Sequence, residues 1–237
     1  MAFALRIMNI LLDSQTLKNS STVANSLMNR ERNCVGGNSY AKELSFNPLD
    51  FLKERLKTQE QITWLDLCCG TGRALIEAAQ HLASENAGPQ LKIIGVDLVP
   101  MFDSYSPELK FLQLIESSVV DWTPSHSFDL ITCVHGLHYI GDKLHLVQKS
   151  CEWLKPDGIF LAHLDLNNFK FEDGQIAGKT IARELKKRGL EYEAKKHLLI
   201  CRGKKVFNLN YTFIGADDKA GPNYTGQAAV DSYYCLG

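Results

Sequence analysis

The stretch Leu65-Asp66-Leu67-Cys68-Cys69-Gly70-Thr71-Gly72 decides the fold of this chain. It ends the apolar run 62–67, which is typical of a strand buried on both faces of a parallel sheet. It precedes residues 74–83, where leucine and alanine recur on one helical stripe. A glycine-rich turn between strand and helix lets the backbone approach a ligand, beside unpaired amide groups at the helix start. The stretch therefore predicts a binding loop at the end of a parallel strand.

The alternation of strand and helix continues along the chain. Further strands are expected at 91–96, 110–115, 128–134 and 159–164. Helices are expected at 47–57, 142–154 and 175–188, with a tight turn at 155–158. Five strands that alternate with helices predict an α/β fold whose parallel sheet is covered on both faces.

The C-terminal part follows a different pattern. Residues 197–201 and 205–213 flank a glycine, and apolar and polar residues alternate in the second segment. This period of two predicts either an antiparallel hairpin or edge strands. Residues 215–237 show no period. We expect one domain with three parts: an N-terminal cap segment and helix at 1–60, a ligand-binding core at 61–165, and a C-terminal helix, final strands and closing tail at 166–237.

Charge and cysteine content limit the function. Lysine plus arginine number 26 and aspartate plus glutamate 27, a balance that argues against a nucleic-acid partner bound through bulk positive charge. The seven cysteines form no Cys-x-x-Cys pair, so free thiols in a reducing cytoplasm are expected. No apolar run reaches the length of a membrane span, and residues 1–12 fit a signal peptide poorly.

Two classes of cofactor use a glycine turn in this position. A dinucleotide fold needs a third glycine, and Leu75 stands there instead. The turn resembles motif I of the class I S-adenosylmethionine-dependent methyltransferases, with Asp66 as its acidic residue, Gly70 and Gly72 as its later glycines, and Cys68 where the first glycine usually stands. The resemblance implies S-adenosylmethionine as the cofactor. It also implies a Rossmann-like, seven-stranded, mostly parallel sheet that ends in an antiparallel strand pair.

The resemblance extends over about residues 40–165. By this similarity Asp97, at the end of the second strand, accepts hydrogen bonds from both ribose hydroxyls. Leu98 would pack on adenine, and Ser118 and Val119 belong to the loop that meets the adenine amino group. Val134 would lie beside the methionine end of the cofactor, and Tyr40 would cap it.

The same resemblance places the methyl acceptor after the fourth strand. His135 and His138 follow that strand, and histidine titrates near neutral pH, so both are candidate catalytic bases. The alternative for each histidine is a purely structural role without catalysis. His163, inside the fifth strand, is expected to belong to the core. The carboxylates that metal-assisted methylation requires are missing after the fourth strand, so no metal ion is expected.

The tail is expected to fold over the carboxyl edge of the sheet and to help bind the acceptor. The candidate acceptor-binding residues are Asp165, Asn223, Tyr224, Asp231 and Tyr233. The function that we expect is methyl transfer to an oxygen or nitrogen atom of a small molecule or peptide, by a monomer or homodimer. The alternatives are a cofactor-binding protein without catalysis and a nucleotide-dependent oxidoreductase.

Overall fold

The computed structural model describes residues 11–24 and 31–237 of the chain. Residues 1–12 were compared above with a signal peptide, which they fit poorly. All but the last two of them lie outside the described part of the chain. A central sheet has seven strands in the order β3-β2-β1-β4-β5-β8-β7. Its strands are β1 (Ile62–Leu67), β2 (Leu91–Asp97), β3 (Leu112–Glu116), β4 (Phe128–Cys133), β5 (Leu154–His163), β7 (Glu191–Glu193) and β8 (Leu198–Arg202). β8 runs antiparallel to both of its neighbours, and the other pairs are parallel. The predicted α/β fold is confirmed.

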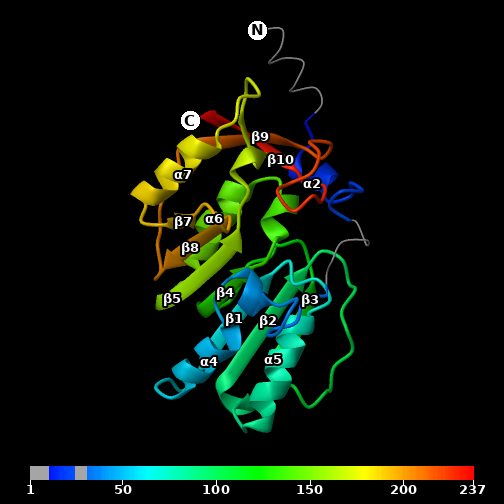
Figure 1. Ribbon diagram of the computed structural model, residues 1–237, viewed down its shortest axis with the longest axis vertical. Coiled ribbons are helices and arrows are strands. Elements are labelled where there is room, and N and C mark those ends of the chain that lie inside the picture. Colours follow the sequence, from blue (N-terminus) through cyan, green and yellow to red (C-terminus); the bar gives the residue numbers. More distant parts are fainter. Residues whose placement is uncertain (1–10, 25–30) are drawn as a thin grey trace.

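Helices cover both faces of the central sheet (Figure 1). Leucine and alanine side chains of α4 (Pro48–Leu56) and α5 (Arg73–Ser84) pack with one face. Side chains of α6 (Lys143–Glu152) and α7 (Gly178–Lys187) pack with the other. Successive residues of β1 alternate between these two cores, as the pleat of a strand requires: Trp64 belongs to the first and Leu65 to the second.

The helices begin where the sequence predicts. Asn47 caps α4 and accepts hydrogen bonds from the amides of Leu49 and Asp50, and Pro48 occupies the first turn. Asp142 caps α6 through the amide of His145. The predicted turn at 155–158 lies inside β5, where the register with β4 shifts between its pairs with Leu154 and Ile159.

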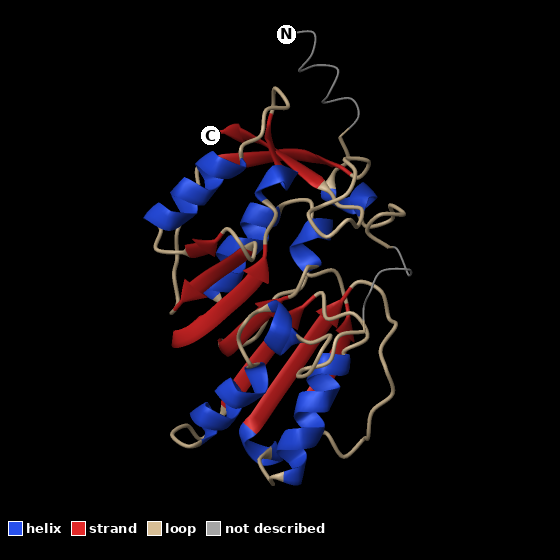
Figure 2. Cartoon of the chain, viewed as in Figure 1, coloured by secondary structure: helices blue, strands red, loops and turns tan. Residues whose placement is uncertain are grey.

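A second sheet of three strands lies apart from the first (Figure 2). It orders β6 (Phe169–Phe171), β10 (Asp231–Leu236) and β9 (Tyr211–Asp217), with β10 in the middle. Figure 1 shows β9 and β10 beside the short helix α2 (Ser14–Leu17), at the end of the molecule opposite α4 and α5. Leu17 of α2 packs there with Ala216 and Val230.

The predicted hairpin of 197–201 with 205–213 is wrong, whereas the alternative of edge strands is confirmed for β9, which lies at one edge of the small sheet. Residues 198–201 are all buried, and β8 obtains partners on both sides by lying between β5 and β7. The half-exposed β9 pairs with β10 instead, inside the segment that shows no period in the sequence. The predicted antiparallel strands are therefore β8 in the large sheet and β9 with β10 in the small one. The division into three segments of one domain stays a prediction.

Candidate active site

A cavity of about 960 Å³, its open mouth included, lies at the carboxyl ends of the central strands. This edge of an open parallel sheet is where such folds bind ligands. The residues predicted from sequence that line the cavity are Tyr40, Cys68, Gly70, Asp97, Leu98, Ser118, Val119, Val134 and His135. Nine candidates from five separate segments therefore come together around one space. Their individual roles stay predictions.

The glycine turn bends through three residues in the left-handed region. Cys68, Gly70 and Gly72 have φ values of 60°, 61° and 75°. Gly72 caps α5 without lining the cavity, and a Cβ added to it would lie 2.6 Å from the Leu114 side chain. Cys68 adopts the left-handed conformation although it has a Cβ atom. Such backbone strain is common at functional sites.

Asp97 joins the second strand to the glycine turn. One of its carboxylate oxygens accepts a hydrogen bond from the Gly70 amide at 2.8 Å, and the other accepts one from the Val99 amide at 3.0 Å. Asp97 also lines the cavity, so the same carboxylate holds the loop and borders the space where a ligand would lie.

Asp66 lies beneath the cavity. It is fully buried and accepts hydrogen bonds from the Tyr40 hydroxyl at 2.7 Å and from the Thr132 hydroxyl at 2.5 Å. Burial raises the pKa of Asp66 to about 7, against these two stabilising bonds. Of this pair, Tyr40 lines the cavity and Asp66 supports it from below.

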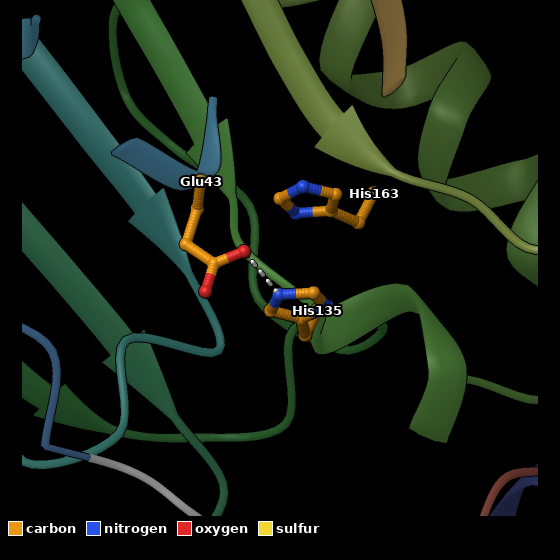
Figure 3. A group of neighbouring side chains, drawn as sticks. All are labelled: Glu43, His135 and His163. Atoms are coloured by element: carbon orange, nitrogen blue, oxygen red, sulfur yellow. Dashed lines mark hydrogen bonds and ion pairs between the residues drawn. The ribbon is translucent and has the colours of Figure 1, made fainter. Parts of the chain in front are cut away.

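His135 stands at the end of β4 with a left-handed φ of 59°. Its Nε2 lies 3.1 Å from Oε2 of Glu43, and its Nδ1 lies 3.4 Å from the hydroxyl of Tyr224. Figure 3 shows the Glu43 carboxylate directed at the His135 ring. The His163 ring stacks on the His135 ring with a centroid distance of 4.1 Å. The hydrogen bond to His135 is the main cause that lowers the pKa of Glu43 to about 2.

His138 does not line the cavity. Its ring is buried in the 3-10 helix η2 (Gly136–Tyr139), and neither nitrogen has a hydrogen-bond partner among the described residues. Burial holds the pKa of His138 well below its ordinary value. The geometry therefore supports His135 as the candidate base, while a role for His138 stays a prediction.

The candidate acceptor-binding residues separate into two groups. Asp165 accepts a hydrogen bond from the Tyr224 amide at 3.1 Å, and the Tyr224 hydroxyl lies 3.4 Å from Nδ1 of His135, although neither Asp165 nor Tyr224 lines the cavity. Tyr224 stacks on His197 with a centroid distance of 3.8 Å. The second group lies outside the cavity lining: Asn223 turns back on Thr225, Asp231 binds Asn168 and Lys170, and Tyr233 lies in β10.

Several lining residues were not expected from the sequence. Four come from the N-terminal segment: Ser14, Leu17, Lys18 and Val23. Arg32 precedes the short helix α3 (Tyr40–Glu43), Tyr139 belongs to η2, and Gln227 belongs to the tail. Glu43 was missed as well, although it stands three residues after Tyr40, a spacing that puts both on one side of a helix. That spacing was the available signal.

Glu43, His135 and His163 form a group whose ligand atoms lie within 4.8 Å of one another. Two imidazoles and a carboxylate are a donor set that suits zinc or iron. The two rings, however, are parallel to within 3° and lie face to face. Because an imidazole binds a metal in the plane of its ring, parallel stacked rings do not direct their lone pairs at one ion. The expected absence of a metal stays a prediction.

The strand order, the reversed strand β8, the glycine turn after β1 and the acidic end of β2 define a class I S-adenosylmethionine-dependent methyltransferase. The chain belongs to the family of methyltransferase domains, whose model matches residues 39–201. The predicted enzyme class and its cofactor, S-adenosylmethionine, are confirmed at the level of this family.

Individual relatives are more distant. The chain is 26% identical over 195 residues to a demethylmenaquinone methyltransferase of Oceanobacillus iheyensis, covering 75% of this chain and 79% of that protein. It is 30% identical over 113 residues to a demethylmenaquinone methyltransferase of Lactobacillus johnsonii, covering 44% of each. A solved S-adenosylmethionine-dependent methyltransferase from Geobacter sulfurreducens, in complex with S-adenosyl-L-homocysteine, is 18% identical with a TM-score of 0.37, covering 60% of this chain and 53% of that one.

Proposed function

We propose that the chain transfers the methyl group of S-adenosylmethionine to an oxygen or nitrogen atom of a small molecule or peptide. The observation that carries this proposal is His135, which lines the cavity and is held by Glu43 at 3.1 Å. The acceptor atom bonds to the methyl carbon while the carbon–sulfur bond breaks. The electron pair of the broken bond stays on sulfur. The proton that the acceptor loses passes to His135. Alignment of the three reacting atoms supplies much of the rate.

The cofactor is proposed to lie along the residues that line the cavity. Asp97 lines the cavity and is proposed to accept hydrogen bonds from the ribose hydroxyls, and Leu98 and Val119 offer apolar contacts to adenine. Ser118 is proposed to meet the adenine amino group. Tyr40 and Val134, with Cys68 and Gly70 of the glycine turn, are proposed to surround the methionine end. Asp66 is proposed to fix Tyr40 and to attract the amino group of the methionine.

The acceptor is proposed to enter beside the N-terminal segment and the tail. Leu17, Val23, Val120 and Ile140 give this part of the cavity an apolar wall, and Tyr139 and Gln227 supply polar groups. Such a wall suits an aromatic or otherwise apolar acceptor with a polar end. A second candidate is an acceptor with a quinone-type ring. It would fit the apolar wall, and two relatives are named demethylmenaquinone methyltransferases.

The test begins with calorimetry, using S-adenosylmethionine and S-adenosylhomocysteine as ligands. The protein is then incubated with hydroxylated aromatics, amines, short peptides and demethylmenaquinone, and mass spectrometry detects any methylated product. We expect binding of both cofactor forms and methylation of at least one acceptor class. Binding without transfer to any class would favour a cofactor-binding protein, and preferential binding of NADH would favour an oxidoreductase.

The tail is proposed to contribute Tyr224 and Gln227 to the acceptor site, since the Tyr224 hydroxyl lies 3.4 Å from Nδ1 of His135 and Gln227 lines the cavity. Tyr224→Phe and Gln227→Ala should raise KM for the acceptor and leave cofactor affinity unchanged. Tyr211→Phe, in β9, is the matched control. An unchanged KM in both tail variants would contradict this role.

A cytoplasmic location is also part of the proposal, supported by the free state of all seven cysteines. Among the residues that the structure describes, no helix is long and apolar enough to cross a membrane. A monomer or homodimer is proposed for the oligomeric state, and light scattering after size-exclusion chromatography measures it.

A further inference from the structure

One short helix links the cofactor side of the cavity to its candidate base. α3 (Tyr40–Glu43) carries Tyr40 at its first position and Glu43 at its last. Tyr40 donates to Asp66, and Glu43 reaches His135, 92 positions further along the chain. Ser39 caps the helix and accepts a hydrogen bond from the Lys42 amide at 3.3 Å. A single rigid turn therefore sets the positions of both side chains.

The Glu43 contact decides which nitrogen of His135 carries the proton. A carboxylate only accepts hydrogen bonds, so at 3.1 Å the Nε2 of His135 must donate to Glu43. In the neutral ring this leaves the lone pair on Nδ1. Arg32 lies on the other carboxylate oxygen at 3.6 Å, and its charge helps keep Glu43 ionised. Glu43 is thus an anion that orients the imidazole and selects its tautomer.

The basic nitrogen faces a hydroxyl group. The Tyr224 hydroxyl lies 3.4 Å from Nδ1, and the stacking of Tyr224 on His197 holds it there. Burial raises the pKa of Tyr224, so its hydroxyl stays protonated. This contact shows that a hydroxyl donor can reach Nδ1 from the side of the tail, which is the proposed direction of the acceptor.

The other groups around His135 do not offer a competing negative charge. His163 of β5 stacks on the ring, and His138 of η2 lies 5.7 Å away between centroids. Burial lowers the pKa of both, for His163 to about 3, so both are neutral near pH 7. Arg32 is a cation beyond the Glu43 carboxylate. When His135 takes up a proton, Glu43 is therefore the neighbour that stabilises the imidazolium ion.

We propose that Glu43 is the positioning residue of His135, orienting its ring and placing the lone pair on Nδ1. This inference rests on the proposed function, in which the acceptor proton passes to His135. In the transfer step that proton bonds to Nδ1, the acceptor lone pair bonds to the methyl carbon, and S-adenosylhomocysteine leaves. Glu43 acts through His135 and takes no proton itself.

The test is the tautomer state of His135, read by ¹H–¹⁵N NMR, which needs neither cofactor nor acceptor. Its signals are assigned by their loss in His135→Asn. In the wild type we expect the tautomer protonated at Nε2, because this nitrogen donates to Glu43. Glu43→Gln should weaken this preference, and Glu43→Asp should restore part of it. Glu54→Gln, an exposed carboxylate of α4, is the control and should leave the preference unchanged.

Thermal unfolding of each variant shows that it is folded before its NMR spectrum is interpreted. Equal tautomer populations of His135 in Glu43→Gln and Glu54→Gln would overturn the inference. So would Zn²⁺ binding at one equivalent that shifts the signals of His135 and His163 together, because it would assign the group to a metal. A failed acceptor screen would overturn the proposed function without changing the NMR result, so the two failures are distinguishable.

Discussion

Tyr40 and Asp66 are joined by a buried hydrogen bond of 2.7 Å that ties the cap helix α3 to the end of strand β1. Tyr40 lines the cavity, whereas Asp66 lies behind it with its second oxygen on Thr132. The acidic residue of the glycine-turn motif thus holds the aromatic cap in place. Under the proposed function this hydrogen bond contributes both to stability and to cofactor binding.

Tyr40→Phe removes one donor from the buried Asp66 carboxylate and keeps the aromatic ring. We expect a loss of about 1.5–3 kcal/mol in the free energy of unfolding, the usual cost of losing a hydrogen bond to a charged group. Affinity for S-adenosylmethionine should fall about tenfold or more. Urea unfolding and calorimetry measure the two effects, and a variant with wild-type affinity would show that Tyr40 does not cap the cofactor.

The raised pKa of Asp66 predicts a pH dependence of cofactor binding. With a pKa of about 7, Asp66 is mostly protonated at pH 6 and mostly ionised at pH 8. The ionised form attracts the cationic amino group of the cofactor, so affinity should rise about tenfold over this interval. Asp66→Asn should bind more weakly and show a flat profile. Calorimetry at pH 6, 7 and 8 makes the comparison, and an equally steep rise in Asp66→Asn would assign the effect to another group.

The buried His163 predicts a loss of stability in acid. Its pKa is lowered to about 3 in the folded chain by burial, against an ordinary value of 6.5. As the pH falls from 6.5 towards 3, the unfolded chain binds more protons than the folded chain, so stability falls. This group should account for about 2 kcal/mol between pH 6 and pH 4.5. His163→Phe should lose correspondingly less stability over that interval, and identical pH slopes of urea unfolding would contradict the assignment.

Gly72 is required for two separable reasons. Its φ of 75° is unfavourable for other residues, and an added Cβ would lie 2.6 Å from Leu114. Gly72→Ala should therefore cost more than the about 1–2 kcal/mol of the left-handed conformation alone. Gly226→Ala is the matched control, because Gly226 has a φ of 81° and nothing within 4 Å of the added Cβ. Equal losses in the two variants, measured by urea unfolding, would show that Leu114 simply moves aside.

Lys143 anchors the tail to the core. It is 1% exposed and donates hydrogen bonds to the carbonyls of Ile140 and Val230 and to the Ser232 hydroxyl. Ser232→Ala leaves one of its donors unpaired, so we expect a loss of about 1–3 kcal/mol in unfolding free energy with unchanged cofactor affinity. Deletion of residues 216–237 would strip two partners from this buried ammonium group and should prevent folding. A stable, folded truncation would contradict the anchor.

The sequence predicts well what is encoded locally. The strand, glycine turn and helix from Ile62 to Ser84 follow from apolar runs and glycine positions within a few residues of one another. The same holds for the caps Asn47 and Asp142. Because parallel strands present their carboxyl ends at one edge, Asp97 and His135 could be expected near the turn.

The remainder depends on contacts between distant segments. Glu43 and His135 are separated by 92 positions, and neither carries a local mark of the other. β8 pairs with β5 and β7 in the central sheet, and β9 therefore pairs with β10. The periodicity of the sequence does not show which partner each strand has. The apolar wall of the proposed acceptor site contains Leu17, which no motif in the sequence connects with the glycine turn.

The central claim is that the cavity at the carboxyl edge holds S-adenosylmethionine with its methyl end towards His135. A crystal structure with S-adenosylhomocysteine tests it most directly. The account predicts the ribose hydroxyls on Asp97, adenine between Leu98 and Val119, and the sulfur atom facing the space between Tyr40 and His135. A ligand bound elsewhere, or with its sulfur turned away from His135, would contradict the account.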